Sequence, residues 1–318
     1  MVKMKLCTRC RRRRSVIKLN YLGESLCKEC FLRYFEEQVM RVLKGTGLLS
    51  RLSGKLVVVA TSGGKDSSNA LYILKELSES YDYEVAALLV NEGIKGYREH
   101  KAKALRALCT RLGVNLIEVS MKKEMGVTID QVALLHERGK LRLKPCSVCG
   151  VFRRYLMNIY AKEVGAEYVA TGHNLDDEVQ TFIMNIIRGD LQSIVREGPV
   201  TRPHIGELIP RFKPLYYLTE KESMLHFILR GLETPYVECP YAKLSMRYQL
   251  RTMINSLEQH SPGTKHRLLR VKESLRKKLG QQIIQQRLRR CSLCGMPTSH
   301  DICRACEIKI ELERIIKA

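Results

Sequence analysis

The sequence has no tryptophan among its 318 residues, and aromatic residues make up only 6% of it. If the protein binds nucleic acid, stacking of bases on many aromatic rings is therefore not the main source of affinity. No apolar run approaches the roughly 20 residues that a membrane-spanning helix needs. The N-terminus carries charge but lacks the apolar segment of a secretory signal. These absences predict a cytoplasmic protein without a membrane partner.

Acidic residues are also scarce, because 33 Asp and Glu stand against 55 Lys and Arg and leave a formal net charge of +22. Residues 1–55 hold 14 basic and 4 acidic residues, and residues 261–290 hold 10 basic residues and one acid, Glu273. Two dense basic blocks predict a polyanionic partner that is bound through its phosphates. No helix-turn-helix or basic zipper is legible, so RNA is favoured over DNA. Hydrophobic residues still reach 45%, which excludes wholesale disorder.

Twelve cysteines are many for a chain expected in the cytoplasm, where disulfides are rare. Eight of them form two quartets of paired C-x2-C motifs: Cys7, Cys10, Cys27 and Cys30 near one end, and Cys291, Cys294, Cys303 and Cys306 near the other. One such pair aims two thiolates at an ion, and two pairs complete a tetrahedral set. We therefore predict two structural Zn²⁺ ions, each of which folds a segment too short to build its own core.

Three further cysteines, Cys146, Cys149 and Cys239, do not complete a zinc quartet. Cys109 lies in a stretch with helical periodicity and is expected to pack as a small hydrophobe. Three ligands suit a catalytic metal with an open position, including an iron–sulfur cluster with one iron that the protein does not hold. The alternative is a redox relay in which the C-x2-C pair cycles between thiol, persulfide and disulfide, with Cys239 as a third sulfur. The spacing leaves both open.

The middle of the chain alternates predicted strands and helices. The apolar run at 56–60 has the character of a parallel strand buried on both faces. Further strands are expected at 85–90, 114–119 and 168–170, and helices at 98–112, 128–138, 150–164, 219–231, 246–258 and 264–280. This alternation predicts an α/β fold, an open doubly wound parallel sheet flanked by zinc-ribbon modules at both termini. The expected domains are an N-terminal zinc module at 1–48, a sheet domain at 49–215, a basic helical extension at 216–288 with a polar connection at 281–286, and a C-terminal zinc module at 289–318.

A glycine-rich loop follows the first predicted strand and leads into a helix; its residues are Ser62, Gly63, Gly64, Lys65, Asp66 and Ser67. The two glycines let the backbone approach a phosphate, and the helix N-terminus adds free N–H groups. The loop is not the G-x-x-x-x-G-K-[ST] pattern, so γ-phosphate transfer is not predicted. A simple helix-capping turn needs one serine or aspartate, but neither two glycines nor a lysine. The loop therefore favours a phosphate site.

The loop resembles the PP-loop of the N-type ATP pyrophosphatases, which cleave ATP to AMP and pyrophosphate and activate a carbonyl oxygen as its adenylate. The segments 91–94, 146–154, 171–177 and 238–240, together with the two cysteine quartets, are similar to motifs of the PP-loop tRNA 2-thiolation family. That family includes the archaeal and eukaryotic cytoplasmic wobble-uridine thiolation proteins and is related to the sulfurtransferases TtuA, which acts on T-loop 5-methyluridine, and TtcA. The resemblance covers nearly the whole chain.

The resemblance implies roles for individual residues. Cys146, Cys149 and Cys239 match the ligands of a 4Fe-4S cluster whose free iron receives sulfide. The loop at 62–67 matches the part that holds the leaving pyrophosphate, and Gly172 and His173 lie on the nucleotide side. Asp177 matches a catalytic aspartate, expected as a base or a Mg²⁺ ligand, whereas one of Asp176 and Asp177 is expected only to cap the next helix. Arg153 stands where TtuA-type members have lysine and wobble-uridine members have arginine, which favours the wobble-uridine branch.

The implied reaction is ATP-dependent 2-thiouridine synthesis by a tRNA sulfurtransferase. The C2 oxygen of a uridine, expected to be the wobble uridine, attacks the α-phosphorus, and sulfur from the cysteine centre then displaces AMP. The implied cofactors are ATP, Mg²⁺, a 4Fe-4S cluster and two Zn²⁺. The implied partners are tRNA, clamped by the zinc modules and the basic helix, a ubiquitin-like sulfur carrier and a second copy of the chain in a homodimer.

The residues and motifs are also compatible with three other functions. The chain could thiolate 5-methyluridine in the T-loop, or act as a PP-loop ligase of the lysidine-synthetase or amidating type, which does not need Cys239. A third alternative is a zinc-ribbon RNA-binding protein with a vestigial nucleotide fold, although the intact loop argues against it.

Overall fold

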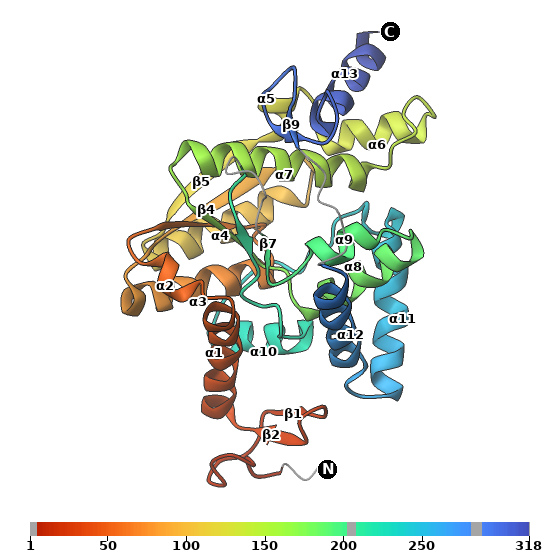
Figure 1. The fold of residues 1–318 in the computed structure, drawn as a ribbon. Coiled ribbons are helices and arrows are strands. Elements are labelled where there is room, and N and C mark those ends of the chain that lie inside the picture. Colours follow the sequence, from red (N-terminus) through yellow and green to blue (C-terminus); the bar gives the residue numbers. More distant parts are fainter. Residues whose placement is uncertain (1–4, 202–207, 281–287, 318) are drawn as a thin grey trace.

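The computed structural model describes residues 5–201, 208–280 and 288–317. A six-stranded sheet forms the centre, and the two cysteine-rich modules lie at opposite ends of the molecule (Figure 1). No helix within these ranges is long and apolar enough to cross a bilayer. The polar connection expected at 281–286 lies outside the described residues.

The central sheet has the strand order β5-β4-β3-β6-β8-β7. Five strands run parallel, and β7 pairs antiparallel with β8 at one edge. The strands are β3 (Leu56–Ala60), β4 (Glu84–Asn91), β5 (Asn115–Ser120), β6 (Tyr168–Thr171), β7 (Val200–Thr201) and β8 (Arg211–Phe212). The predicted doubly wound α/β sheet is confirmed. The short antiparallel edge was not predicted, because two-residue strands carry no readable periodicity.

Alternate residues of β3 enter two hydrophobic cores, one on each face of the sheet. Val57 and Val59 pack on one face with residues of α1, α3, α4 and α10, whereas Val58 packs on the other face with residues of α5, α6 and α7. These helices are α1 (Lys28–Gly45), α3 (Lys65–Tyr81), α4 (Arg98–Leu112), α5 (Met121–Met125), α6 (Ile129–Glu137), α7 (Pro145–Glu163) and α10 (Glu220–Leu229). Because all three valines are fully buried, β3 fits only the middle of a covered sheet, and this places the loop that follows it centrally.

Helices α11 and α12 pack against α8 and form a third, smaller core around Leu250, Ile254 and Leu269. The remaining helices on this side of the molecule are α8 (Leu175–Ile187), α9 (Leu191–Arg196), a 3₁₀ turn (Ala242–Leu244), α11 (Met246–His260) and α12 (Thr264–Leu279). Two lysines of the basic block turn inward here, since Lys265 pairs with Asp176 and Lys272 pairs with Glu178 at 2.6 Å. These two lysines anchor α12 to α8 and are not part of its exposed basic surface.

The two cysteine-rich modules are short antiparallel hairpins attached to the sheet domain by helices. The N-terminal module is joined to α10 by Tyr21 and Tyr34, which both donate hydrogen bonds to the buried carboxylate of Glu222. The C-terminal hairpin is followed by α13, which packs against α7. Their elements are β1 (Ile17–Leu19), β2 (Glu24–Leu26) and α2 (Leu49–Leu52) at one end, and β9 (Arg289–Arg290), β10 (Pro297–Thr298) and α13 (Arg304–Lys317) at the other.

Candidate active site and metal centres

The loop at 62–67 connects the end of β3 to the first turn of α3. No side chain caps the N-terminus of α3 at Gly64, so its first N–H groups are left for an anion. Gly63 has a positive φ of 70°, and a Cβ there would collide with the carbonyl of Lys101. Gly172 of the neighbouring loop would place a Cβ 2.6 Å from the Ser67 nitrogen. Both glycines are therefore needed for the close approach of backbone that a phosphate site uses.

Polar side chains hold this loop in shape. The Ser67 hydroxyl donates to the Gly64 carbonyl at 3.0 Å and accepts from the Ser62 N–H at 3.1 Å. Lys65 Nζ contacts Asp66 at 2.7 Å and Glu220 of α10 at 3.0 Å. These bonds join residues within the loop, and Glu220 is a further partner that the loop motif does not contain.

A chain of charged groups runs from this loop to the cysteines. Arg98 of α4 donates to the Ser62 carbonyl at 2.6 Å and pairs with Glu92 at 2.5 Å, and both of these side chains are 2% exposed. The other oxygen of Glu92 lies 3.5 Å from Arg153. Arg153 in turn interacts electrostatically with Cys149, one turn earlier on α7. The nucleotide loop and the cysteine centre are therefore neighbours.

The structure gathers Cys146, Cys149 and Cys239 at one place. The Cys146 thiol donates to the carbonyl of Tyr241 at 3.2 Å, which ties it to the segment that carries Cys239. Burial raises the pKa of all three thiols, that of Cys149 to about 12, and the closeness of Cys239 raises those of the other two further. Five residues before Cys239, Thr234 donates to the Gly63 carbonyl at 2.5 Å. The same segment thus touches both the cysteine centre and the nucleotide loop.

Cys146 and Cys149 lie within the first five residues of α7, ahead of the helix start expected at 150. Helix α7 begins at Pro145, five residues earlier than the predicted start at 150, because proline is favoured in the first turn of a helix. Within the described ranges, the sulfur atoms of this trio are not gathered within 4.8 Å as the two quartets are. A cluster in which each thiolate binds a different iron fits this spread better than a single ion does.

Asp177, at the start of α8, takes part in the helix cap and also lines a cavity. Asn174 is the N-cap of this helix, its side chain accepts from the Asp177 N–H, and Asp177 accepts from the Asn174 N–H in return. Burial raises the pKa of Asp177 to about 6, although Arg247 at 3.3 Å opposes the shift. The expectation that one of the two aspartates only caps the helix is thus not met: Asp177 caps and also faces the cavity, while Asp176 binds Lys265 and the Glu220 N–H.

A cavity of about 290 Å³, here called the nucleotide cavity, opens beside these groups and is lined by Lys65, Asp66, Asp177 and Arg251, among others. Asp66 Oδ1 is buried and has no hydrogen-bond partner within the described part of the chain. Asp66 also raises the pKa of Asp177, so the two carboxylates lie within electrostatic reach. An orphaned carboxylate oxygen beside a second carboxylate fits the oxygen ligands that Mg²⁺ prefers. Next to the cavity, burial lowers the pKa of His173 to about 3, and its Nδ1 is paired with Thr171 at 2.9 Å.

The two cysteine quartets form compact sulfur sets. Within each quartet the four sulfur atoms lie within 4.8 Å of one another, with Cys10–Cys27 at 3.8 Å and Cys294–Cys303 at 3.6 Å. A tetrahedron with Zn–S bonds of about 2.3 Å has edges of roughly 3.8 Å. Although burial acts against it, backbone N–H groups lower the pKa of Cys7 and Cys291 to about 6, toward the thiolate form that binds metal. The geometry of both quartets fits zinc.

Sequence reasoning missed three residues that shape the site: Arg98, Lys101 and Glu220. Arg98 and Lys101 lie on α4, whose periodicity predicts a helix but not that its first turn faces the nucleotide loop. A Cβ on Gly64 would lie 3.7 Å from Lys101 Nζ, and Lys101 also interacts electrostatically with Cys239. The sequence offered one hint of their position: the segment 91–94 follows β4, and parallel strands end at the same edge of the sheet, so the helix that begins after it lies near the nucleotide loop.

The sheet, the glycine loop at the end of β3 and the uncapped α3 define a PP-loop domain, and the PP-loop domain family matches residues 34–257. Residues 6–32 match the N-terminal LIM domain of the 2-thiouridine synthetase TtuA. With both matches in the same order as the two structural parts, the chain belongs to the PP-loop tRNA 2-thiolation family, whose members are tRNA sulfurtransferases.

Individual relatives match over nearly their whole length. The chain is 36% identical over 306 residues to the tRNA-5-methyluridine(54) 2-sulfurtransferase of Pyrococcus horikoshii, covering 96% of this chain and 93% of that protein. It is 33% identical over 325 residues to the tRNA 2-thiolation protein NcsA of Haloferax volcanii, covering 97% and 99%. The solved structure of the U34-tRNA thiolase NcsA from Methanococcus maripaludis with its 4Fe-4S cluster is similar with a TM-score of 0.82 at 30% identity, covering 98% and 97%.

Proposed function

We propose that this protein adenylates the C2 oxygen of the wobble uridine of tRNA and replaces that oxygen with sulfur. The observation that carries the proposal is the meeting of two groups of residues. Cys146, Cys149 and Cys239 lie next to the nucleotide loop and are joined to it through Arg153, Glu92 and Arg98. An enzyme that activates an oxygen with ATP and then delivers sulfur needs both groups at one reacting carbon.

The loop at 62–67 binds the β- and γ-phosphates of ATP in this proposal. The N–H groups at the start of α3 and the ammonium of Lys65 face the charge that develops on pyrophosphate as it leaves. Lys65 is held by Asp66 and Glu220, so it is positioned before the nucleotide arrives. Asp66 and Asp177 are the residues that would hold Mg²⁺, which screens the phosphates from these carboxylates.

Cys146, Cys149 and Cys239 are the residues that would hold a 4Fe-4S cluster, as in the NcsA structure that this chain resembles. With three protein ligands, such a cluster supplies an iron that can carry a sulfide. Arg153, fixed by Glu92, places a positive charge beside Cys149 and lowers the cost of its thiolate form. Sulfide attack on C2 breaks the bond to the adenylated oxygen, which leaves with AMP.

Arg153 is also the residue that favours the wobble uridine over the T-loop uridine, because the wobble-uridine members have arginine at this position. The two identities, 36% to a position-54 enzyme and 33% to a thiolation protein of the NcsA group, are too close to choose between the branches. Action on 5-methyluridine in the T-loop is therefore the second candidate function.

The remaining predictions concern the domains, metals and partners. The cysteine modules at 1–48 and 289–318 are proposed to hold one Zn²⁺ each and, with the exposed residues of α12 in the extension at 216–288, to clamp the phosphates of tRNA around the ATP-binding domain at 49–215. A ubiquitin-like sulfur carrier as donor and a homodimer as assembly stay predictions, as does the cytoplasmic location.

The deciding experiment compares Cys239→Ala with Cys109→Ala in anaerobically reconstituted protein given ATP, Mg²⁺, sulfide and tRNA. Cys109 is a matched control because it is 3% exposed in the core and lies outside the trio. Mass spectrometry of the tRNA nucleosides should find 2-thiouridine with wild type and Cys109→Ala, and none with Cys239→Ala. A Cys239→Ala protein that still forms 2-thiouridine would exclude the sulfur centre, whereas a sulfur-free modification made alike by wild type and both variants would favour a ligase.

A pair of tRNAs then separates the two candidate uridines; uridine 54, where present, is first methylated at C5, because the second candidate substrate is 5-methyluridine. One carries cytidine at position 34 and the other carries cytidine at position 54. Loss of product only with the first tRNA supports the wobble assignment, and loss only with the second transfers the assignment to the T-loop.

A further inference from the structure

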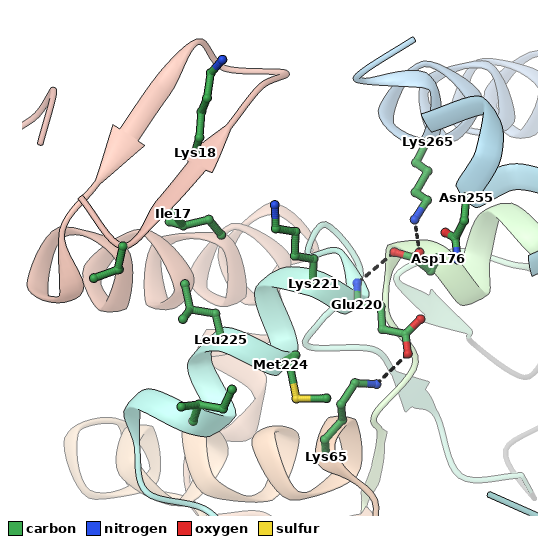
Figure 2. A pocket seen from close by; sticks show the side chains of 12 residues that line it. Ile17, Lys18, Lys65, Asp176, Glu220, Lys221, Met224, Leu225, Asn255 and Lys265 are labelled. Atoms are coloured by element: carbon green, nitrogen blue, oxygen red, sulfur yellow. Dashed lines mark hydrogen bonds and ion pairs between the residues drawn. The ribbon is translucent and has the colours of Figure 1, made fainter. Parts of the chain in front are cut away.

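A second cavity, of about 540 Å³, lies between the N-terminal hairpin and helices α10, α11 and α12, and is here called the hairpin pocket. Its walls come from parts of the chain that are far apart in sequence: Ile17 on β1, Lys221 and Met224 on α10, and Lys265 on α12 (Figure 2). The pocket exists only because the N-terminal module folds back over α10. None of the assigned steps uses it.

One wall of the hairpin pocket is apolar, whereas Lys65, Asp176, Glu220 and Lys265 line the side toward the nucleotide cavity. Ile17, Met224 and Leu225 point into the pocket (Figure 2), and Ile228 adds a side chain that is 62% exposed. Aliphatic side chains that meet in one hollow can pack against the face of a flat apolar group. Aliphatic side chains can sandwich a base that has left its stack, which matters in a chain without tryptophan.

The rim of the hairpin pocket carries two lysines without acidic partners. Lys221 rises from α10 toward the hairpin, and Lys18 extends outward from β1 (Figure 2). Both side chains are exposed, and neither has a carboxylate within ion-pair distance among the described residues. By contrast, the deeper lysines are occupied, because Lys65 pairs with Glu220 and Lys265 with Asp176. The pocket therefore offers free positive charge at its mouth, one apolar wall, and paired charges on the opposite side.

The hairpin pocket is next to the nucleotide cavity but differs from it in chemistry. Both are lined by Lys65, Asp176 and Glu220, so only these charged groups separate them. The helix end that faces the hairpin pocket is closed, since Thr219 caps α10 and the Glu220 N–H is bound by Asp176. A triphosphate finds no free N–H groups there and meets two carboxylates, whereas a phosphodiester needs only the lysines at the rim.

We propose that the hairpin pocket binds one unpaired nucleotide of the bound tRNA, with the base on the apolar wall and the flanking phosphates on Lys18 and Lys221. This inference rests on the proposed function, which makes tRNA the substrate, and goes beyond it by assigning a separate RNA subsite. The subsite joins the basic N-terminal module to the edge of the nucleotide cavity, so RNA that occupies it runs toward the loop that holds ATP.

The absence of native tryptophan gives a direct test. Ile228→Trp places a single fluorophore in the hairpin pocket at an already exposed position, and Leu134→Trp, at a 44% exposed position on α6, is the control. We expect tRNA to quench the emission of Ile228→Trp and to leave that of Leu134→Trp unchanged, while ATP alone changes neither. Equal responses of the two variants to tRNA, or quenching of Ile228→Trp by ATP alone, would overturn the proposal.

A second measurement tests the rim. Each phosphate contact of a single strand contributes about 0.7 to the slope of log affinity against log salt. The double variant Lys18→Ala/Lys221→Ala should therefore lower that slope by about 1.4 and weaken tRNA binding roughly 20-fold at 0.1 M salt. The control Lys103→Ala/Lys162→Ala removes two exposed lysines of α4 and α7 that do not line the pocket.

The outcomes separate this inference from the proposed function. If wild type binds and thiolates tRNA but the two double variants bind it equally well, the subsite is wrong and the function stands. If wild type neither binds nor thiolates tRNA, the proposed function fails, and the subsite fails with it. A selective loss in Lys18→Ala/Lys221→Ala supports both.

Discussion

At the scale of single residues, Asp177 shows how one carboxylate can serve structure and chemistry together. It closes the capping box at the start of α8 and also faces the nucleotide cavity opposite Asp66. Burial raises its pKa to about 6, so its charged form is costly in the folded protein without a bound cation. This is the pattern expected of a group that is held ready for a cation.

The substitution Asp177→Asn tests this balance through pH. Because the pKa is raised, the favourable contribution of the protonated carboxyl is present at low pH and is lost as pH rises through about 6. Asparagine keeps the capping geometry without the charge, so the metal-free variant should be more stable than wild type by about 1 kcal/mol at pH 8 and equal to it only near pH 3, below the ordinary aspartate pKa. Thermal unfolding at both pH values measures this.

Activity should move in the opposite direction from stability. AMP formation by wild type should fall below pH 6, and Asp177→Asn should lose roughly 100-fold at every pH. A variant that keeps its activity, or that is stabilised equally at pH 3 and pH 8, contradicts the role given to this carboxylate.

Lys101 gives a second prediction at the residue scale. Its ammonium lies against Gly64 and, within the described residues, has no carboxylate at ion-pair distance. Burial, together with Arg98 and Lys65, lowers its pKa, and a phosphate group would reverse that repulsion. We expect Lys101→Met to raise the KM for ATP about 10-fold with a smaller effect on kcat. Lys103→Met on the exposed face of the same helix should leave both constants unchanged in pyrophosphate-release kinetics.

At the scale of elements, α12 shows why a basic helix cannot be assigned to RNA from composition alone. Lys265 and Lys272 are seven residues apart and so lie on one face, which packs on α8. Glu178 is enclosed by Lys213 and Lys272, which lower its pKa to about 2 although burial alone would raise it. Two of the basic residues of α12 are therefore buried in ion pairs with α8. The exposed ones are Arg267, Arg270, Lys277 and Lys278.

The substitution Lys272→Met should therefore destabilise the protein, whereas Lys277→Met should not. Removing one partner of a buried pair commonly costs 3–5 kcal/mol, and because Lys213 still contacts Glu178 we expect about 2–3 kcal/mol here. The exposed control should change the free energy of unfolding by less than about 0.5 kcal/mol. Urea unfolding at pH 7 measures both.

The pH dependence of the same pair follows from the lowered pKa of Glu178. Its stabilising charge is present above the ordinary carboxyl range and is lost as pH falls toward 2. The difference between wild type and Lys272→Met should therefore shrink on acidification. A constant difference across that range would assign the loss to packing alone.

The elements that sequence reasoning found are those with long, regular patterns. The strands at 56–60, 85–90, 114–119 and 168–170 and the helix at 98–112 agree with β3, β4, β5, β6 and α4 within a residue or two. The start of α7 was placed too late, because the apolar periodicity begins only after the cysteines, although Pro145 marks the true start. The ion pairs of Glu92 with Arg98 and of Lys65 with Glu220 join residues brought together only by the fold, and no local pattern reports them.

At the scale of the whole molecule, the two cysteine quartets lie at opposite ends, and each is bound to a core of the sheet domain. Phe31 and Phe35, which follow Cys30 on α1, belong to the same core as Val57 and Val59 of β3. Cys291 and Cys303 belong to the core on the other face of the sheet. Disruption of either quartet should therefore lower the stability of the sheet domain as well as that of its own module.

Metal analysis tests this arrangement. We expect two Zn²⁺ per chain in wild type and in Cys109→Ser, and one in each of Cys10→Ser and Cys294→Ser. Each single-site loss should lower the Tm by several degrees, because the ion's binding free energy contributes to folding. Elemental analysis with calorimetry provides both numbers. Full zinc content in either quartet variant would remove that quartet from the assignment.

The carboxylate of Glu222 on α10 is hydrogen-bonded to the N-terminal module, so the module and α10 depend on each other for stability. It is 1% exposed and accepts from Tyr21 and Tyr34 of the module and from Thr219 at the start of α10. Cutting the chain near residue 48 would leave this buried acid short of two donors. A chimaera that takes its first 48 residues from a relative must therefore take a compatible start of α10 from that relative as well. For the same reason, we expect substitutions in these two segments to accompany one another in evolution.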